Sequence, residues 1–275
     1  MNATSTILPF LKQTIHIEKY DTENAKAIVV LVHGFGEHLG RYAANVIPML
    51  THAGCTVYGY DNFGHGKSSG KRGHCQSYES LLQLLNTIIN LAKKDNPELP
   101  LFLYGHSMGG NLVLNYGLRY KEPLAGIIAT SPYLKLAFHP PKWKLILGRA
   151  LLKIAPSITL PTGMDTNLLS RNQDVIDAYN DDPLVHDRVS PMFSFPIMDA
   201  GEWAITHANQ LTISTLLVHG SADKIIDVAG TKAFHDKAAT TTTFYCDEGG
   251  YHELHWDANA DAILAMIQNW LQQQL

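Results

Sequence analysis

Short, continuous runs of apolar residues alternate along the chain with longer segments whose apolar residues recur every three or four positions. The short runs are rich in β-branched residues and meet Gly, Asp or Ser at their carboxyl ends, which predicts strands that are buried on both faces. Strands alternating with helices indicate βαβ units and a mostly parallel sheet flanked by helices, an α/β fold. The predicted strands are residues 27–34, 56–61, 101–106, 125–131, 214–220 and 241–247.

The helical pattern recurs between these strands. It covers residues 41–54, 77–94, 111–120 and 261–275, and the first of these helices is expected to break near Pro48. Ahead of the first buried strand, residues 13–20 are expected to form an antiparallel strand at the edge of the sheet.

Residues 133–212 interrupt this alternation because they contain no convincing core strand. A structureless loop of that length is uncommon in a compact domain, so we expect this segment to form helices of its own. We therefore divide the chain into a core, residues 1–132 and 213–275, and a cap inserted at the carboxyl edge of the sheet, residues 133–212.

One serine stands at the joint between a predicted strand and a predicted helix. Ser107 is the centre of Gly105-His106-Ser107-Met108-Gly109, which fits the G-x-S-x-G pattern of a nucleophile on a sharp strand-to-helix turn. Ligands of open α/β sheets bind beyond the carboxyl ends of the strands, where this turn lies. Taken alone, the pattern also fits a serine that only caps a helix, with glycines kept for close packing.

A serine hydroxyl needs a base to take its proton and an acid to orient that base. On a sheet of this kind the chain order is Ser, then Asp or Glu, then His. Asp223 follows the strand at 214–220, and His252 lies in a glycine-rich loop after the last strand. We predict Ser107, Asp223 and His252 as a catalytic triad. Asp227, which is expected to open a helix, is the second candidate for the acid.

His255 is the rival candidate for the base, although it is expected to start the final helix. The segment His252-Glu253-Leu254-His255 places its histidines three positions apart, whereas the HExxH pattern of zinc peptidases places them four apart. We therefore predict no metal site and no cofactor. The backbone N–H groups of Phe35, in the loop after the first buried strand, and of Met108 are expected to form the oxyanion hole.

Composition narrows the function classes. The formal net charge is −4 and the sequence contains no block of Lys or Arg, so nucleic acid is not an expected partner. The three cysteines are far apart, the first residues lack the pattern of a secretory leader, and no apolar run reaches the ~20 residues of a membrane span. We expect a cytoplasmic protein. The sequence contains no signal for an oligomeric state.

Six segments together resemble the monoacylglycerol lipases of the α/β-hydrolase fold, which are often grouped with lysophospholipases. They are residues 33–42, 61–70, 105–110, 170–184, 219–225 and 251–255. The resemblance implies a carboxylic ester hydrolase with a helical cap that cleaves a small lipid ester, monoacylglycerol, to glycerol and free fatty acid. It assigns the same triad and oxyanion donors. It also implies that Glu37, Arg41 and His255 receive the glycerol head.

Alternatives accompany these assignments. Glu37 and Arg41, four residues apart, could form a salt bridge on a first helical turn, and such a bridge could also shape the pocket. Helix 142–154 mixes cations with apolar residues; we favour an apolar face turned inward over an acyl tunnel, and the alternative is transient contact with a membrane surface. Phe193 and Trp203 are candidates for the pocket lining. A short-chain carboxylesterase, a lysophospholipase and a non-catalytic ligand-binding protein on the same fold are the alternative functions.

Overall fold

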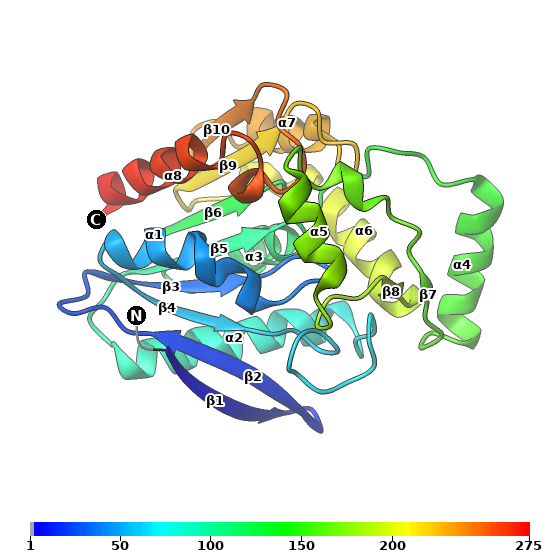
Figure 1. The fold of residues 1–275 in the computed structure, drawn as a ribbon, viewed down its shortest axis with the longest axis horizontal. Helices are drawn as coiled ribbons and strands as arrows, with labels where there is room; N and C mark the ends of the chain where they lie inside the picture. Colours follow the sequence, from blue (N-terminus) through cyan, green and yellow to red (C-terminus); the bar gives the residue numbers. More distant parts are fainter. Residues whose placement is uncertain (1–2) are drawn as a thin grey trace.

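The computed structural model describes residues 3–275, and one eight-stranded sheet forms its centre (Figure 1). The strand order is β1-β2-β4-β3-β5-β6-β9-β10, and all neighbouring pairs from β4 to β10 are parallel. The six predicted strands lie within two residues of their predicted bounds, which confirms the mostly parallel sheet. They are β3 (Ala27–Val32), β4 (Cys55–Tyr60), β5 (Leu101–His106), β6 (Gly126–Thr130), β9 (Thr215–Gly220) and β10 (Thr242–Asp247).

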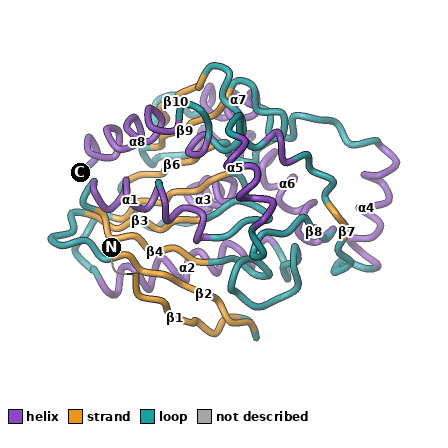
Figure 2. The backbone as a smooth tube through the Cα atoms, in the orientation of Figure 1, coloured by secondary structure: helices purple, strands orange, loops and turns teal. Residues whose placement is uncertain are grey.

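Helices cover both faces of this sheet (Figures 1 and 2). α1 (Val46–His52) and α8 (Ala260–Gln274) lie on one face, and α2 (Tyr78–Asp95), α3 (Met108–Arg119) and α7 (Val228–Lys237) lie on the other. Successive side chains of a strand point to opposite faces, so Val29 packs in the cluster with α1 and Val30 in the cluster with α2. Continuous apolarity in β3, β4, β5, β6 and β9 therefore follows from burial on both sides. The same expectation was wrong for β10, because it is the edge strand and half of its residues are exposed.

The strand predicted at 13–20 is present as β2 (Gln13–Tyr20), antiparallel to β4, but it is not the edge of the sheet. β1 (Ala3–Phe10) pairs with its outer side across a hairpin turn in which Leu11 and Lys12 have positive φ. Six of the eight residues in β1 are exposed and none is fully buried, so this strand has no apolar pattern that would identify it.

The first predicted helix is divided at Asn45 and not at Pro48. A 3₁₀-helix, η1 (Leu39–Ala44), precedes α1, and Asn45 caps α1 with its side-chain oxygen. Pro48 lies in the first turn of α1, where backbone N–H groups have no intrahelical acceptor, so its missing donor costs little there.

Segment 133–212 contributes no strand to the eight-stranded sheet. Its two short strands pair only with each other. α6 packs against α3 and α2, with Phe193 and Ile197 in the cluster on that face of the sheet, whereas α4 stands away from the sheet and contacts α6 (Figure 1). Its elements are α4 (Lys142–Ile154), β7 (Leu160–Pro161), η2 (Thr166–Leu168), α5 (Gln173–Asp181), β8 (Arg188–Val189), α6 (Pro191–His207) and η3 (Ala208–Gln210).

α4 turns only some of its apolar residues inward, in part against the prediction: Leu145, Leu151 and Leu152 are half-buried, whereas its other large apolar residues face solvent. No residue of α4 is buried, and Trp143, Ile146, Leu147 and Ile154 are 63%, 72%, 52% and 79% exposed. The contact with α6 is narrow: Gly148 lies against the Phe195 ring, and Arg149 pairs with Asp199. The helix therefore has an apolar side that nothing else within residues 3–275 covers. Between residues 3 and 275, no helix has the length and apolarity needed to cross a membrane.

Candidate active site

Ser107 occupies a strained turn between the end of β5 and the start of α3. Its φ is 52° and its ψ is −111°, values that L-residues rarely adopt and that cost of order 1–3 kcal/mol. The turn is held on both sides, because the Ser107 N–H donates to the Thr130 carbonyl and the Ser107 carbonyl accepts from the N–H groups of Asn111 and Tyr133. The Ser107 side chain makes no capping bond to α3, so its hydroxyl is available for another partner.

The two glycines of the motif are required by close backbone approach. A Cβ at Gly109 would lie 2.0 Å from the Val32 carbonyl oxygen, and a Cβ at Gly105 would lie 2.3 Å from the Gly109 carbonyl oxygen. Any larger side chain would separate α3 from β3 and β5 and move Ser107.

His252 lies within hydrogen-bond distance of both Ser107 and Asp223. The Ser107 hydroxyl is 3.0 Å from His252 Nε2, and His252 Nδ1 is 2.7 Å from Asp223 Oδ2. All three residues are buried. Asp223 accepts from Nδ1–H, which leaves Nε2 as the acceptor for the serine proton, the orientation needed for a general base.

Electrostatics favour a charged Asp223 beside a basic imidazole. Burial would raise the pKa of Asp223, but the charge and hydrogen bond of His252, together with His219, hold the pKa of this carboxyl well below its usual range. Burial would lower the pKa of His252, but the charge and hydrogen bond of Asp223 raise the pKa of this imidazole above its ordinary value.

Asp223 and His252 are each fixed by further bonds. Asp223 Oδ1 accepts from the N–H groups of Ile225 and Ile226, at 2.8 and 3.0 Å, and His219 Nε2 lies 3.1 Å from Oδ2. The Ser131 hydroxyl donates to the His252 carbonyl at 2.7 Å. Sequence reasoning missed His219, although its position on β9, four residues before Asp223, was a usable signal.

The two rival residues serve other purposes in the fold. Asp227 caps α7 by accepting from the Ala229 N–H, and it pairs with Lys135. His255 does not start the final helix as predicted: it lies in the 3₁₀-helix η4 (Leu254–Trp256), whereas α8 begins at Ala260. His255 is fully buried and its ring stacks on Tyr42, 5.1 Å between centroids.

Met108 directly follows Ser107, and the loop that carries Phe35 approaches this serine, since a Cβ at Gly34 would lie 3.4 Å from the Ser107 Cβ. Met108 is the first residue of α3, and Phe35 lies in the loop after β3. The Phe35 ring contacts Phe193 from α6, 5.0 Å between centroids, so Phe193 packs directly beside this loop. Trp203 lies elsewhere, between His207 and Arg119, whose guanidinium is 3.8 Å from the indole centroid.

Glu37 and Arg41 form the ion pair that their spacing allows, with Arg41 Nη1 2.5 Å from Glu37 Oε2. A third residue, not recognised from the sequence, completes the arrangement: Glu253 accepts from both terminal nitrogens of Arg41 at 2.6 and 2.7 Å. Glu37 also accepts from the Tyr42 hydroxyl. Burial would raise the pKa of Glu37, but the charge of Arg41 lowers it. Because Glu253 is 212 positions from Arg41, no local spacing rule connects them.

A cavity of about 280 Å³ lies between the Phe35 loop and segment 133–212. Phe35 lines one side, and Met164, Tyr179, Val185 and His186 line the other. The His186 N–H donates to the Gly36 carbonyl at 2.8 Å, which ties the segment to the loop. Of the candidate catalytic and oxyanion residues, Phe35 lines this cavity, whereas Ser107, Met108 and His252 do not.

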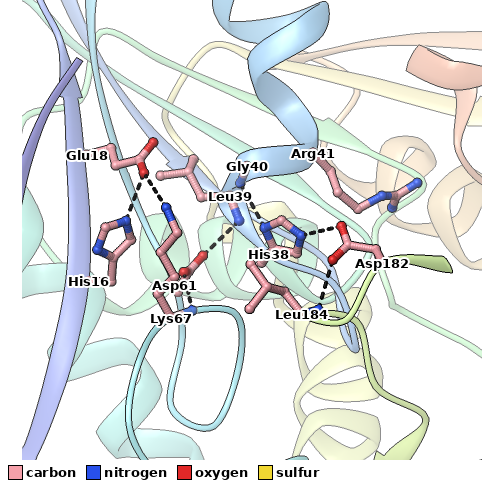
Figure 3. Close-up of a pocket in the computed structure, with 10 residues that line it drawn as sticks. All are labelled: His16, Glu18, His38, Leu39, Gly40, Arg41, Asp61, Lys67, Asp182 and Leu184. Atoms are coloured by element: carbon pink, nitrogen blue, oxygen red, sulfur yellow. Dashed lines mark hydrogen bonds and ion pairs between the residues drawn. The ribbon is translucent and has the colours of Figure 1, made fainter. Parts of the chain in front are cut away.

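A second cavity, of about 190 Å³, is polar, and its charged groups are paired with one another (Figure 3). Glu18 lies 2.8 Å from His16 and 3.3 Å from Lys67, and His38 lies 2.8 Å from Asp182. The Arg41 guanidinium points away from Glu18 and Lys67 in this view (Figure 3). Neither Ser107 nor His252 lines the cavity. Across residues 3–275, no three His, Cys, Asp or Glu side chains are grouped to hold a metal ion.

Comparisons with known proteins agree with this geometry. A family model described as "Serine aminopeptidase, S33" matches residues 23–259. The monoacylglycerol lipase of Mycolicibacterium smegmatis is 32% identical over 248 residues, which cover 90% of this chain and 88% of that protein. The crystal structure of Paleococcus ferrophilus monoacylglycerol lipase superimposes with a TM-score of 0.88 at 35% identity, covering 95% of this chain and 99% of that one.

A longer relative also matches. An uncharacterized abhydrolase domain-containing protein of Dictyostelium discoideum is 34% identical over 279 residues; the match covers all of this chain but only 29% of that protein. These matches confirm the predicted fold and family: the chain belongs to the serine hydrolases of the α/β-hydrolase fold, in the monoacylglycerol lipase-like family of carboxylic ester hydrolases.

Proposed function

We propose that this protein hydrolyses carboxylic esters of fatty acids, with monoacylglycerol as its substrate and glycerol and a free fatty acid as the products. The observation that carries the proposal is the continuous set of contacts from the Ser107 hydroxyl through His252 to Asp223, at 3.0 and 2.7 Å. The names of similar proteins support the choice of a monoacylglycerol.

The reaction proceeds in two halves. Ser107 Oγ attacks the acyl carbonyl carbon while its proton passes to His252 Nε2, and the N–H groups of Phe35 and Met108 stabilise the tetrahedral oxyanion. His252 then gives that proton to the departing glycerol oxygen, which leaves the acyl group on Ser107. Water loses a proton to His252 and attacks the acyl-enzyme, and the proton returns to Ser107 as the fatty acid leaves.

Segment 133–212 is the proposed cap, and the cavity between it and Phe35 is the proposed entrance for the ester. The glycerol end lies on the side of Glu37, Arg41 and His255. Because Glu37 and Arg41 already bond to each other, they contribute by shaping that end of the pocket. The fully buried His255 ring, whose two nitrogens have no partner, is the group on this side with free hydrogen-bonding capacity.

The exposed apolar side of α4 supports transient contact with a lipid surface. Trp143, Ile146 and Ile154 face solvent, with Lys142, Lys144 and Lys153 on the same helix. An amphipathic helix of this kind binds at the boundary between headgroups and acyl chains. Contact there would bring the cap to the membrane from which a monoacylglycerol is taken.

A substrate panel tests the proposal. Wild type and Ser107→Ala are assayed on monoacylglycerols of several chain lengths, lysophospholipids and short-chain esters. We expect turnover of monoacylglycerols that falls by at least about 10⁴-fold in the variant. If the protein hydrolyses lysophospholipids or short-chain esters faster than monoacylglycerols, the assignment of monoacylglycerol as the substrate is wrong. Failure of a fluorophosphonate probe to label the native protein at Ser107 would favour a non-catalytic binding protein.

A further inference from the structure

Glu253 and Arg41 form a buried bidentate ion pair between the loop that carries His252 and η1, the 3₁₀-helix that follows the Phe35 loop. The two hydrogen bonds are 2.6 and 2.7 Å long. Glu253 is 2% exposed, and the Arg41 side chain is 9% exposed. Two parallel N–H···O bonds to a carboxylate restrict both side chains to one relative orientation.

The pair is one link in a longer set of contacts. Glu253 directly follows His252 in the sequence. Arg41 also donates to Glu37, and Glu37 Oε1 accepts from the Gly34 N–H at 2.7 Å, one residue before Phe35. Hydrogen bonds therefore run without a gap from the residue next to the base to the residue next to an oxyanion donor.

The charges in this set do not cancel. Two carboxylates, Glu37 and Glu253, share one guanidinium, which leaves one net negative charge in a buried region. Buried ion pairs contribute little net stability, because the cost of desolvation offsets their attraction. An arrangement of this kind is better suited to holding the two segments in fixed positions and to stabilising a positive charge nearby.

His252 is that nearby group. Asp223 bonds to its ring, and the His106 ring packs against it with 5.0 Å between centroids. Burial lowers the pKa of His252, whereas the charges of Asp223, Glu253 and Glu37 raise it. The neighbouring His106 is held neutral, because burial lowers its pKa to about 3. The positive charge that forms on His252 is thus opposed by Asp223 and by the excess charge around Arg41.

We propose that Glu253 is a positioning residue for ester hydrolysis. Through Arg41 and Glu37 it holds the His252 loop at a fixed distance from the Phe35 loop, and its charge stabilises the imidazolium that forms when Ser107 gives up its proton. The inference rests on the proposed function, since it needs His252 to act as the base.

Glu253→Gln tests both the positioning role and the electrostatic role of Glu253, because it keeps the size of the side chain and removes its charge. We expect kcat to fall by about 10- to 100-fold with KM little changed, since small displacements of catalytic groups cost up to about 10²-fold. We also expect the acid limb of the kcat/KM profile to move to lower pH, because a neutral Gln no longer favours protonated His252. Glu253→Asp keeps the charge but shortens the side chain, so kcat should fall while the acid limb stays in place.

Glu248→Gln is the matched control. Glu248 is an exposed carboxylate in the same loop, and its replacement should change neither kcat nor the acid limb. If Glu253→Gln behaves like Glu248→Gln, the positioning role is wrong. Should Glu253→Gln fail to fold, full kcat in Glu253→Asp would overturn the role equally well.

Labelling of Ser107 by a fluorophosphonate probe separates this inference from the proposed function. If wild type is labelled and Ser107→Ala is not, but the pH profile of Glu253→Gln matches that of wild type, only the role of Glu253 fails. If wild type itself is not labelled, the proposed function fails and the role of Glu253 fails with it.

Discussion

The imidazole of His252 donates from Nδ1 to Oδ2 of Asp223 across 2.7 Å, inside a region where both side chains are buried. That single bond determines which ring nitrogen carries the proton, and so which nitrogen faces Ser107. It also sets the charge balance at the base, since the Asp223 carboxylate is the main group that raises the pKa of His252.

Replacing Asp223 with Asn should therefore abolish most activity without unfolding the protein. The amide can donate to Nδ1, which favours the wrong tautomer, and kcat should fall by about 10⁴-fold. Asp227→Asn is the matched control because Asp227 caps α7 and pairs with Lys135. It should retain kcat within about twofold and lose at most a few tenths of a kcal/mol of unfolding free energy, because Asn caps a helix about as well as Asp and the ion pair with Lys135 is solvent-exposed. Steady-state ester hydrolysis measures kcat, and thermal unfolding measures stability. Equal losses of kcat in the two variants would contradict the assignment of Asp223 as the acid.

The pH dependence of kcat/KM should show the effect of the bond between His252 and Asp223. His252 accepts a proton only when it is neutral, so activity falls as the pH drops below the pKa of this imidazole. Because Asp223 raises that pKa, the acid limb of wild type should lie above the ordinary histidine value of about 6.5. In Asp223→Asn the negative charge is gone, and the limb should move to lower pH. A limb that does not move between the two proteins would mean that another group controls it.

Gly109→Ala should displace the turn that holds Ser107. The new Cβ would lie 2.0 Å from the Val32 carbonyl oxygen, a backbone atom that cannot rotate away. We expect a loss of about 3 kcal/mol or more in unfolding free energy and a large loss of activity. Gly117→Ala, in the same helix, meets only the ends of flexible side chains, those of Ile127, Ile213 and Leu211, and gains helix propensity. Its unfolding midpoint should therefore change far less. Chemical denaturation and ester hydrolysis measure the two effects, and similar midpoints for the two variants would contradict the packing argument.

Sequence patterns predicted the elements whose own residues show whether they are buried. β5 was predicted with its observed bounds, because an apolar run covered on both faces ends at the polar residues of the Ser107 turn. β1 escaped prediction because it is largely exposed and is held mainly by pairing with β2. For Asp223 and His252, chain order and strand ends were enough to select two residues that the fold brings together with Ser107. Their contacts with His219, Ser131 and Glu253 depend on the tertiary fold and leave no comparable spacing in the sequence.

α4 illustrates a different limit. Its residue pattern indicates an amphipathic helix, but a pattern cannot specify whether the apolar side meets protein or solvent. The structure places that side outward, with Ile146 and Ile154 at 72% and 79% exposure. The proposed membrane contact would explain this exposure, because lipid would then cover the apolar side of α4.

The double variant Ile146→Glu/Ile154→Glu tests that contact. Both side chains are exposed, so thermal stability should change little. Binding to vesicles of neutral and anionic phospholipid should weaken, because the variant adds charge where apolar area would enter the lipid. Hydrolysis of monoacylglycerol presented in those vesicles should fall severalfold, whereas hydrolysis of a dissolved short-chain ester should stay unchanged.

Gln272→Glu/Gln273→Glu adds the same two charges to exposed positions of α8, which lies far from α4 (Figure 1). This control should bind vesicles almost as well as wild type, since α8 presents no comparable apolar side to solvent. Equal loss of vesicle binding in both double variants would assign the effect to overall charge. Vesicle sedimentation measures the binding. If the α4 variant binds as well as wild type, α4 does not contact the lipid surface.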